Sequence, residues 1–593
     1  MKKYIITTGK LLFATFLFFS CNDESLERYP LDRISNETFW NSENDLMVYN
    51  NSIYDLAKND GNVPIMMGHD AGWYSTYYSI WYLDQFSDNI GSDRSRAFYQ
   101  KVRSGKYIVP TNPGGQRYGY KGWNFVRAVN VGLANYSKAS VAQSVIDKYA
   151  GEARLFRGWF YADKVSKFGN APWVDHELNI DSEELFAKRM PREDVMAKVL
   201  EDLDFAVDHL PADWGDGNAP GRLNRWCALQ VKSRVCLFEG TWQKYHGGTN
   251  PDMWLQEAAG AAKELIETGP YSLYVTGDPD HDYNAYQRAE DLTGNPEVLY
   301  WRRYQLGIVS HNVMSFHVRH NGGATKSMVE DYLCTDGLPI TLSPLYMGDE
   351  VYENIFANRD PRLRQTILYP ADQAYYNYDG ELFYSYPRLV GMIGGTSTES
   401  GYHIIKVYDS SERFVSWNGC TSPAITLRLG EALLNYAEAK AELGTITQAD
   451  LDMSINKLRD RVGMPHMDLS NIPVDPRYVN DGVSPLIVEI RRERRVELFM
   501  EGFRYDDLRR WKQGKKLEIP SYGMRWDAAA KAKYDPDGDV TMKTSLVDGV
   551  PYIDIYKGTD WADPVFDENK HYLWPIPLSV ISQNNNIVQN PGW

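Results

Sequence analysis

Cysteine is scarce in this chain of 593 residues, which has five cysteines and no C-x-x-C pair. Zinc sites and thioredoxin-like redox sites use such closely spaced pairs, so the sequence supports neither. If Cys227 and Cys236 share a helix, about 13.5 Å of helical rise separates them, which is too far for a disulfide. We expect the four cysteines that follow the N-terminal leader to be buried free thiols: Cys227, Cys236, Cys334 and Cys420.

Positive charge is also in deficit. The chain has 63 Lys and Arg against 79 Asp and Glu, a formal net charge of −16. A nucleic-acid groove needs clustered Lys and Arg to neutralise phosphates, and electrostatic adhesion to anionic lipid needs the same. The composition therefore speaks against both, and we expect no nucleic-acid partner. After the leader no apolar run is long enough for a transmembrane helix, so none is expected.

Catalytic signatures are missing too. The chain has no H-E-x-x-H motif, no G-x-S-x-G elbow and no Walker loop. Acid pairs such as Glu183-Glu184 and Asp506-Asp507 are adjacent in sequence, which does not place two carboxylates across a glycosidic bond. The Asp-rich segments 278–282 and 535–539 lack the glycine and the terminal glutamate of an EF-hand. We expect solvated turn acids there, with an opportunistic cation as the alternative, and no catalytic residue, metal or cofactor.

Aromatic residues, by contrast, are abundant. Seventeen Trp, 41 Tyr and 21 Phe make up 13% of the chain. Tyr outnumbers Phe about two to one, whereas a hydrophobic core alone favours Phe, Leu and Ile. Tyr and Trp combine a flat apolar face with a polar edge, which suits wet, amphipathic surfaces. The excess is the first indication of a wet, amphipathic surface.

The N-terminus has the layout of a secretory signal. Lys2 and Lys3 are followed by an apolar run, residues 11–19, which is too short to span a membrane. The chain then becomes abruptly polar, which argues against an N-terminal core helix. We predict a signal peptide over residues 1–20.

Ser20-Cys21 at the cleavage point resembles a bacterial lipoprotein lipobox, with Phe18 where leucine is usual. The resemblance implies that Cys21 is lipidated, and several acyl chains suffice for stable anchoring. The acidic residues after Cys21 resemble the signal that sends lipoproteins of the Bacteroidetes to the outer face of the outer membrane. Loss of three leader lysines changes the net charge from −16 to −19.

The rest of the chain alternates between helical pairs and long stretches rich in Tyr, Gly and Pro. On one predicted helix, Leu433, Tyr436, Ala437 and Ala441 share a face. Helix, turn, helix and then proline is the layout of tetratricopeptide units, here irregularly spaced. We predict a mainly α fold, with tetratricopeptide-like helical pairs forming a scaffold that carries long loop-rich insertions and few short strands. The predicted helical blocks are 36–58, 122–168, 191–210, 225–243 paired with 252–268, and 426–443 paired with 447–462.

No Ser/Gly-rich or Pro-rich linker divides the chain, so we predict a single domain over 21–593. Its N-terminal helical part, 22–240, carries an aromatic insertion at 61–121. Its C-terminal part, 241–593, carries two further insertions. Loops this long in a compact protein are usually functional or contain short strands. The two C-terminal insertions are 270–425 and 512–570.

Three aromatic patches lie in these insertions. The first patch covers residues 70–82, the second is Tyr300–Tyr304 and the third covers residues 375–386. Sugar rings stack their C–H faces on aromatic planes, and their hydroxyls need carboxylate, amide and guanidinium partners. The alternative is core packing, because the aromatic residues of the first patch recur at helical spacing. The candidate ligand-binding residues are Asp70, Trp73, Tyr77, Trp81, Asn89, Arg94, Trp301 and Tyr304.

The segment from Glu489 to Trp511 is the most charged helical region of the chain. It has two interpretations, an anion or substrate site and a buried lattice of ion pairs that holds the last helices on the scaffold. Arginine suits bidentate pairing with carboxylates. We favour the lattice.

Several long motifs, in order along nearly the whole chain, resemble the SusD/RagB family of outer-membrane nutrient-uptake lipoproteins. The resemblance implies a mostly helical fold, capture of glycans or other nutrients, and a SusC-like, TonB-dependent transporter as partner. It implies no catalysis. The motifs are 26–30 (LERYP), 34–35 with 39–40, 152–157 (EARLFR) with 168–172 (FGNAP), 428–439, 456–461, 493–498, 501–511, 574–577 (WPIP) and 589–593 (QNPGW).

The sequence therefore predicts a lipid-anchored protein on the outer membrane, facing the cell exterior, that binds glycan and delivers it to a SusC-like transporter. Two alternatives remain. One is a secreted glycoside hydrolase on a helical scaffold, and the other is a structural transporter lid with little ligand affinity of its own. The aromatic inventory is compatible with starch, fructan, N-glycan, pectin or xylan, and with peptide cargo.

Overall fold

A computed structural model describes most of the chain after the leader. The predicted signal peptide, Cys21 and most of the first aromatic patch lie outside the described residues. The described residues are 39–58, 65, 67–69, 79–93, 97–114, 118–215, 221–313, 322–370, 375–376, 382–383, 387–390, 398–408 and 416–593.

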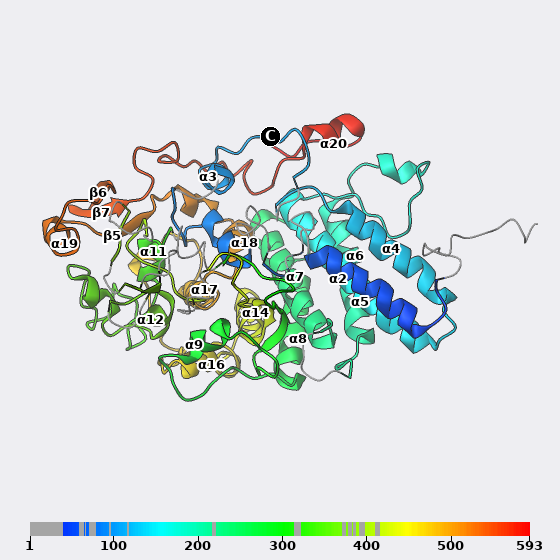
Figure 1. Cartoon of the computed structure of the whole chain (residues 1–593), viewed down its shortest axis with the longest axis horizontal. Helices are drawn as coiled ribbons and strands as arrows, with labels where there is room; N and C mark the ends of the chain where they lie inside the picture. The colour runs from blue at the N-terminus through cyan, green and yellow to red at the C-terminus, as the bar shows by residue number, and fades with distance from the viewer. Residues whose placement is uncertain are drawn as a thin grey trace, which may run out of the picture.

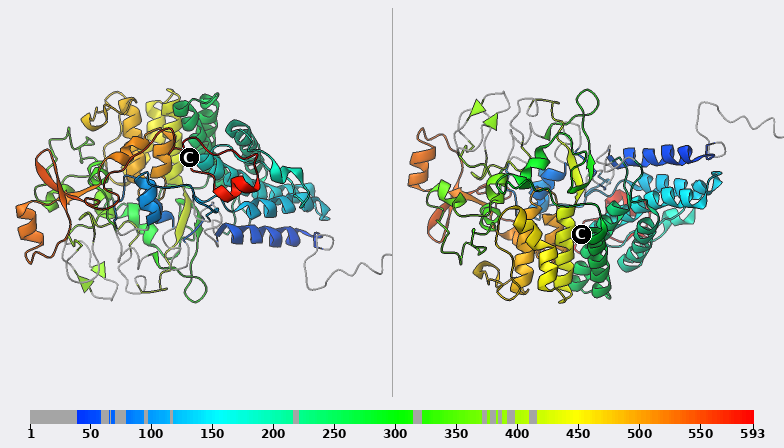
Figure 2. Two further views of the ribbon diagram at one scale, coloured as in Figure 1. Left: turned by 90° about the horizontal axis from the view of Figure 1, so that it is seen from above. Right: turned by 90° about the horizontal axis from the view of Figure 1, so that it is seen from below.

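A row of packed helices forms the scaffold. Helices α5 and α6 pack together, α7 packs on α8, and α14 packs on both α8 and α17. Figure 1 shows α2, α4, α5 and α6 at one end of the long axis and the small sheet of β5 to β7 at the other. Figure 2 shows the row from two sides, running from blue and cyan helices through green to yellow. The scaffold helices are α2 (Glu43–Lys58), α4 (Trp123–Asn135), α5 (Gln143–Phe168), α6 (Arg192–His209), α7 (Arg225–His246), α8 (Pro251–Thr268), α14 (Leu429–Glu442) and α17 (Pro485–Glu497).

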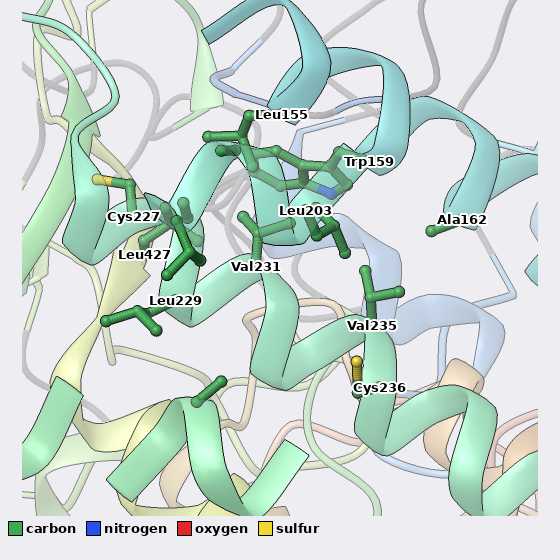
Figure 3. Packing of buried hydrophobic residues seen from close by; sticks show 14 of the residues in the cluster. Leu155, Trp159, Ala162, Leu203, Cys227, Leu229, Val231, Val235, Cys236 and Leu427 are labelled. Carbon is green, nitrogen blue, oxygen red and sulfur yellow. The ribbon is translucent and has the colours of Figure 1, made fainter. Parts of the chain in front are cut away.

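Small residues allow these helices to approach closely. A Cβ added to Gly240 of α7 would lie only 2.8 Å from Leu255 Cγ of α8, so this contact requires glycine. Figure 3 shows how Leu155 and Trp159 of α5, with side chains of α6 and α7, fill the space between the helices. Each buried aliphatic side chain contributes about 1.5–3 kcal/mol to this packing.

The helix ends follow capping rules that can be read in the sequence. The Asn224 side chain accepts a hydrogen bond from Cys227 N at the start of α7, which ends at Gly247 with φ of 89°. Ser484 caps α17 ahead of Pro485, the residue type favoured at a first helical position. Thr447 and Asp450 form a reciprocal capping box.

Three predicted boundaries were wrong. Helix α2 begins at Glu43 rather than at 36, because the Asp45 carboxylate binds the backbone N–H groups of Asn41 and Ser42. The predicted block 122–168 consists of α4, η4 and α5, and the non-helical residues 139–142 end with Ala142 in extended conformation. Residues 424–428 form a strand rather than the start of a helix, since they pair with a second strand.

Short helices and strands lie outside the row of scaffold helices, as predicted for the insertions. Strand β1 pairs antiparallel with β4, β2 with β3, and β7 lies between β5 and β6. The short helices are η3 (Ile80–Phe86), α3 (Ala97–Arg103), η4 (Tyr136–Lys138), η5 (Glu183–Phe186), α9 (Asp282–Ala285), η6 (Tyr286–Arg288), α11 (Lys326–Glu330), η7 (Tyr352–Phe356), α12 (Arg362–Thr366), α15 (Gln448–Met453), α16 (Ile455–Arg461), η8 (Pro476–Tyr478), α18 (Arg504–Arg510), η9 (Gly514–Glu518), α19 (Ala528–Tyr534) and α20 (Leu578–Gln583). The strands are β1 (Val298–Arg302), β2 (Tyr375–Tyr376), β3 (Leu382–Phe383), β4 (Ala424–Arg428), β5 (Tyr522–Arg525), β6 (Thr544–Val547) and β7 (Val550–Asp554).

The predicted fold class is confirmed, since the described chain is mainly helical with few short strands. The cysteine prediction is confirmed as well, because all four thiols are free and buried: Cys227, Cys236, Cys334 and Cys420. Across the described ranges, no helix is both long enough and apolar enough to cross a membrane.

Candidate functional site

The two ends of the first aromatic patch meet the second patch in space. The backbone N–H of His69 donates to the Tyr304 hydroxyl at 2.6 Å, and that hydroxyl donates to the His69 carbonyl at 2.7 Å. On the other side of the patch, the Trp81 ring lies 4.2 Å from the His69 ring. The described residues His69 and Trp81, which precede and follow 70–78, therefore lie side by side, with Tyr304 bonded to His69.

Close backbone approach explains the glycine before His69. A Cβ on Gly68 would lie 2.5 Å from Arg302 Cδ and 2.9 Å from the Tyr304 hydroxyl oxygen. A larger residue at position 68 would require the side chains of Arg302 and Tyr304 to shift.

A buried cluster of aromatic rings lies at this junction. The His311 ring lies 4.7 Å from His69 and 4.5 Å from Tyr304, centroid to centroid. Burial lowers the pKa of His69 well below its usual value and that of His311 to about 4. Both imidazoles are neutral at pH 7, and His311 Nε2 lies 2.8 Å from the carbonyl oxygen of Ser422. The cluster is a fixed support and holds no imidazolium at neutral pH.

The structure places four of the predicted site residues in the interior. Trp81, Asn89, Trp301 and Tyr304 are at most 5% exposed. Trp301 packs beside Tyr286 in a small apolar cluster, which fits the packing alternative. Ligand contact by any of the predicted residues stays a prediction, but these four side chains are covered by protein. Asp70, Trp73, Tyr77 and Arg94 lie outside the described residues.

Asn89 links η3 to the charged helix α17. Its Oδ1 accepts a hydrogen bond from Arg495 Nε at 2.8 Å, and its Nδ2 donates to Asp84 Oδ2 at 3.0 Å. The same Asp84 oxygen accepts from Met500 N at 2.7 Å. Burial raises the pKa of Asp84 to about 6, against the opposing effect of these hydrogen bonds. These contacts fix the position of η3, which contains the last residues of the first patch.

Asp88 completes the same support. Arg504 binds it through two nitrogens, at 2.7 and 2.8 Å, and Arg495 lies 3.2 Å away. Burial would raise the pKa of Asp88, but Arg495 and Arg504 outweigh it and hold the pKa well below its usual value. The carboxylate next to the aromatic patch is thus already paired within the protein.

The charged segment 489–511 is a buried ion-pair lattice, which confirms the interpretation favoured from the sequence. Glu497 accepts hydrogen bonds from Arg461 at 2.7 and 2.8 Å and from Arg428 at 2.8 Å. Arg492 binds Asp331 at 2.9 Å and Asp475 at 2.6 Å. All these side chains are buried. The lattice joins α14, α16 and α17 to the insertions.

A cavity of ≈ 120 Å³ lies beside η3, between the scaffold and β4. Aromatic side chains and matched ion pairs line it, including Arg192–Glu239 and Arg234–Glu431, each at 2.6 Å. Sequence reasoning missed this cavity because its lining comes from residues between 80 and 510, and no local motif connects them.

The third patch and the acidic loops complete the predicted sites. Tyr375 pairs with Phe383 and Tyr376 with Leu382 in a short hairpin, and the rest of that patch lies outside the described residues. Asp282 is not a solvated turn acid, since it is buried and accepts the backbone N–H groups of residues 276–278. Within the described ranges, no cluster of three or more His, Cys, Asp or Glu is suited to a metal ion.

Comparisons with known proteins agree with this architecture. Residues 303–593 match the model of the SusD family. A SusD-like protein of Bacteroides ovatus is 23% identical over all of this chain and 97% of its own length. SusD-like protein P2 of Formosa agariphila is 22% identical, with both chains fully covered.

Solved structures show the same fold. A SusD-like protein from Bacteroides fragilis superposes with a TM-score of 0.69 at 22% identity, over 95% of this chain and all of that one. A SusD-like carbohydrate binding protein from the same species gives a TM-score of 0.68 at 22% identity, over 93% of this chain and 99% of that one. Sequence relatives and fold agree: residues 303–593 match the SusD family model, and the chain as a whole is similar to SusD-like proteins.

Proposed function

We propose that this protein is a cell-surface lipoprotein that binds glycan and delivers it to a SusC-like, TonB-dependent transporter of the outer membrane. The match of residues 303–593 to the SusD family model supports the proposal, and one structural neighbour is a SusD-like carbohydrate binding protein. The observation that carries it is the junction of the first and second aromatic patches at His69, Trp81 and Tyr304.

The binding mechanism follows from that junction. Residues 67–69 and η3 hold both ends of the first patch on a base of buried rings and arginine-bound carboxylates. Trp73 and Tyr77 then supply stacking planes, and Asp70 and Arg94 supply hydrogen bonds to sugar hydroxyls. A site held in place before the ligand arrives loses less conformational entropy on binding. No covalent step is involved.

The environment of the two described carboxylates near the first patch, Asp84 and Asp88, favours binding without hydrolysis. Glycosidases need one carboxyl group free to donate a proton and a second that acts as a base or nucleophile. Asp88 is bound by two arginines, and Asp84 is buried and hydrogen-bonded to backbone and to Asn89. Neither faces open solvent, so neither is placed to attack or protonate a glycosidic bond.

Anchoring at Cys21 supplies the membrane attachment. The described chain begins at Phe39, 18 residues after the predicted lipidated cysteine. Acyl chains at this cysteine hold the protein at the outer membrane without a spanning helix, and the transporter is then within reach along the same surface.

The test uses the mature chain and its Trp73→Ala and Tyr77→Ala variants, with binding to a panel of soluble polysaccharides measured by affinity electrophoresis. We expect loss of binding, because a central aromatic contact is worth about 2 kcal/mol or more, with the melting temperature nearly unchanged. The control is Phe186→Ala, an aromatic residue that is 57% exposed on η5. Unchanged glycan binding in both patch variants would refute the site.

A further inference from the structure

The cavity beside η3 contains hydrogen-bond donors that the described residues leave unused. Its volume of ≈ 120 Å³ is well above the about 10–15 Å³ that a single water requires. Its walls come from η3, α5, α6, α7, β4, α14, α17 and α18, and Figure 3 shows Trp159, Ala162 and Val235 of the lining. The cavity therefore lies where the scaffold helices meet the charged segment 489–511.

Arg494 of α17 supplies the first donor. Its Nε donates to Asp507 Oδ2 at 2.9 Å, and its Nη1 donates to Asn435 Oδ1 at 2.8 Å. Among the described residues, its Nη2 has no hydrogen-bond partner. The residue is only 3% exposed, yet Nη2 is not one of the unpartnered polar atoms that are fully buried. The open space that Arg494 lines is the cavity, so the unused N–H groups of Nη2 face it.

Arg234 of α7 supplies a second donor to the lining. Its Nε and Nη2 each bind Glu431 at 2.6 Å, and Nη2 also donates to the Thr426 carbonyl at 3.1 Å. No group in the described part of the chain accepts a hydrogen bond from its Nη1. The guanidinium carbons of Arg234 and Arg494 lie 5.0 and 5.3 Å from the centre of the Phe503 ring. The two cations therefore lie beside the same aromatic ring.

The carboxylates of the lining are already paired within the protein. Each of the six has a cationic partner at 2.5–2.9 Å, so a cationic ligand would have to displace one of these partners. The unused groups of the two arginines are donors, which suit an acceptor with negative charge. The pairs are Asp163–Lys167, Glu239–Arg192, Glu431–Arg234, Glu501–Arg428, Asp506–Arg509 and Asp507–Arg494.

We propose that this cavity binds a monovalent carboxylate, with Arg494 as the hydrogen-bond donor and Arg234 as a second cation nearby. A hydrogen bond between two charged groups is stronger than one between neutral groups. An anion with two charges is disfavoured, because the lining itself contains six carboxylates. The apolar side chains of Ile80, Leu83 and Val235 suit the carbon body of the ligand. An acidic sugar and a small free acid both have this chemistry.

The donors are held in place before a ligand arrives. Asp507 accepts hydrogen bonds from the Nε atoms of Arg494 and Arg510, each at 2.9 Å, and Arg510 also binds Glu438 at 2.8 Å. A preformed site loses less conformational entropy when it binds. The inference goes beyond the proposed function, which requires no anion, and it does not rest on the first patch.

The test is saturation-transfer NMR on the full mature chain at pH 7, with butyrate and D-glucuronate as probes and their neutral amides, butyramide and glucuronamide, as comparisons. At least one carboxylate should bind at millimolar concentration, and more tightly than its amide. Arg494→Lys should weaken that binding about tenfold, because lysine keeps a charge for Asp507 but lacks the second donor. Ala162→Leu, at a lining position on α5, should fill part of the cavity and weaken binding, with an unchanged or higher melting temperature.

Arg225→Lys is the matched control, because Arg225 also lies on α7 but pairs with Glu264 outside the cavity. This variant should bind the carboxylate as the parent does. Binding of glucuronate alone would identify an acidic sugar as the ligand, and binding of butyrate a small free acid. The inference is overturned if neither carboxylate binds, if the amides bind equally well, or if Arg494→Lys leaves the affinity unchanged. If Arg494→Lys does not fold, unchanged affinity in Ala162→Leu overturns it.

Discussion

At the scale of single residues, burial decides what an aromatic side chain can do. Trp81 was a candidate ligand contact, yet it is 5% exposed and packs on His69. Trp301, on β1, is also buried, at 3% exposed. Sequence spacing cannot separate these two roles, because burial depends on how the fold brings side chains together. Trp81 packs on His69, and His69 is itself held by Tyr304, 235 residues later in the chain.

Substitution of Trp81 tests this assignment. Trp81→Ala should destabilise the protein by about 3–5 kcal/mol, as expected for a large buried aromatic side chain, because it leaves a cavity. The measurement is chemical unfolding of the mature chain, with Trp81→Phe as the milder comparison. A melting temperature within a degree or two of the parent would place the ring on the surface instead.

Asp84 gives a pH-dependent test. Its pKa is raised from 3.8 to about 6, so folding favours the protonated carboxyl. The stability gained from that protonation is complete below about pH 4 and is lost as the pH rises through 6. Asp84→Asn should therefore be neutral or stabilising at pH 7.5, with Asn Oδ1 still accepting from Met500 N.

The matched control for Asp84 is Asp88→Asn. The pKa of Asp88 is lowered, so its ionised form stabilises the fold at neutral pH, and that stability is lost as the pH falls through the lowered pKa. This variant should lower the melting temperature at pH 7.5, because Arg504 loses its carboxylate partner and Arg495 loses one of its two. Equal effects of the two substitutions at pH 7.5 would contradict the assigned pKa directions.

At the scale of elements, α17 is stabilised by its ion pairs as a set. Glu497→Gln should cost about 3–5 kcal/mol, because it removes a buried carboxylate that the guanidinium groups of Arg362, Arg428 and Arg461 share. Glu518→Gln breaks an exposed pair with Lys515 and should cost less than about 1 kcal/mol. Urea unfolding of both variants provides the comparison, and similar losses would show that the lattice contributes no more than a surface pair.

Helical elements were predictable where local chemistry sets them. Helix α6 was expected over 191–210 and occupies Arg192–His209, and α8 was expected over 252–268 and occupies Pro251–Thr268. The break at Ala142 was not predicted, since that residue has no helix-breaking side chain. Strand β4 was missed because its partner β1 lies more than 120 residues earlier, so its pairing is a tertiary effect. The cavity beside η3 was hidden for the same reason, since its lining comes from residues between 80 and 510.

At the scale of the whole molecule, the proposed function requires a lipid on Cys21 that holds the protein at the cell surface. Cys21→Ser removes the sulfur that would carry the acyl chains, so the protein should leave the membrane fraction and appear in the periplasm or medium. Cell fractionation with immunodetection measures this. Cys420→Ser, at a buried free thiol, controls for the loss of a cysteine. Retention of the Cys21→Ser protein in the membrane would show that another feature anchors it.

Glycan binding without hydrolysis is the central claim for the molecule as a whole. The most direct measurement is affinity electrophoresis of the mature wild-type chain in gels that contain each polysaccharide of a broad panel, with reducing ends assayed in the same samples. The account predicts retarded migration on at least one polysaccharide and no new reducing ends. Unretarded migration on every polysaccharide, or sustained release of reducing ends, would contradict it.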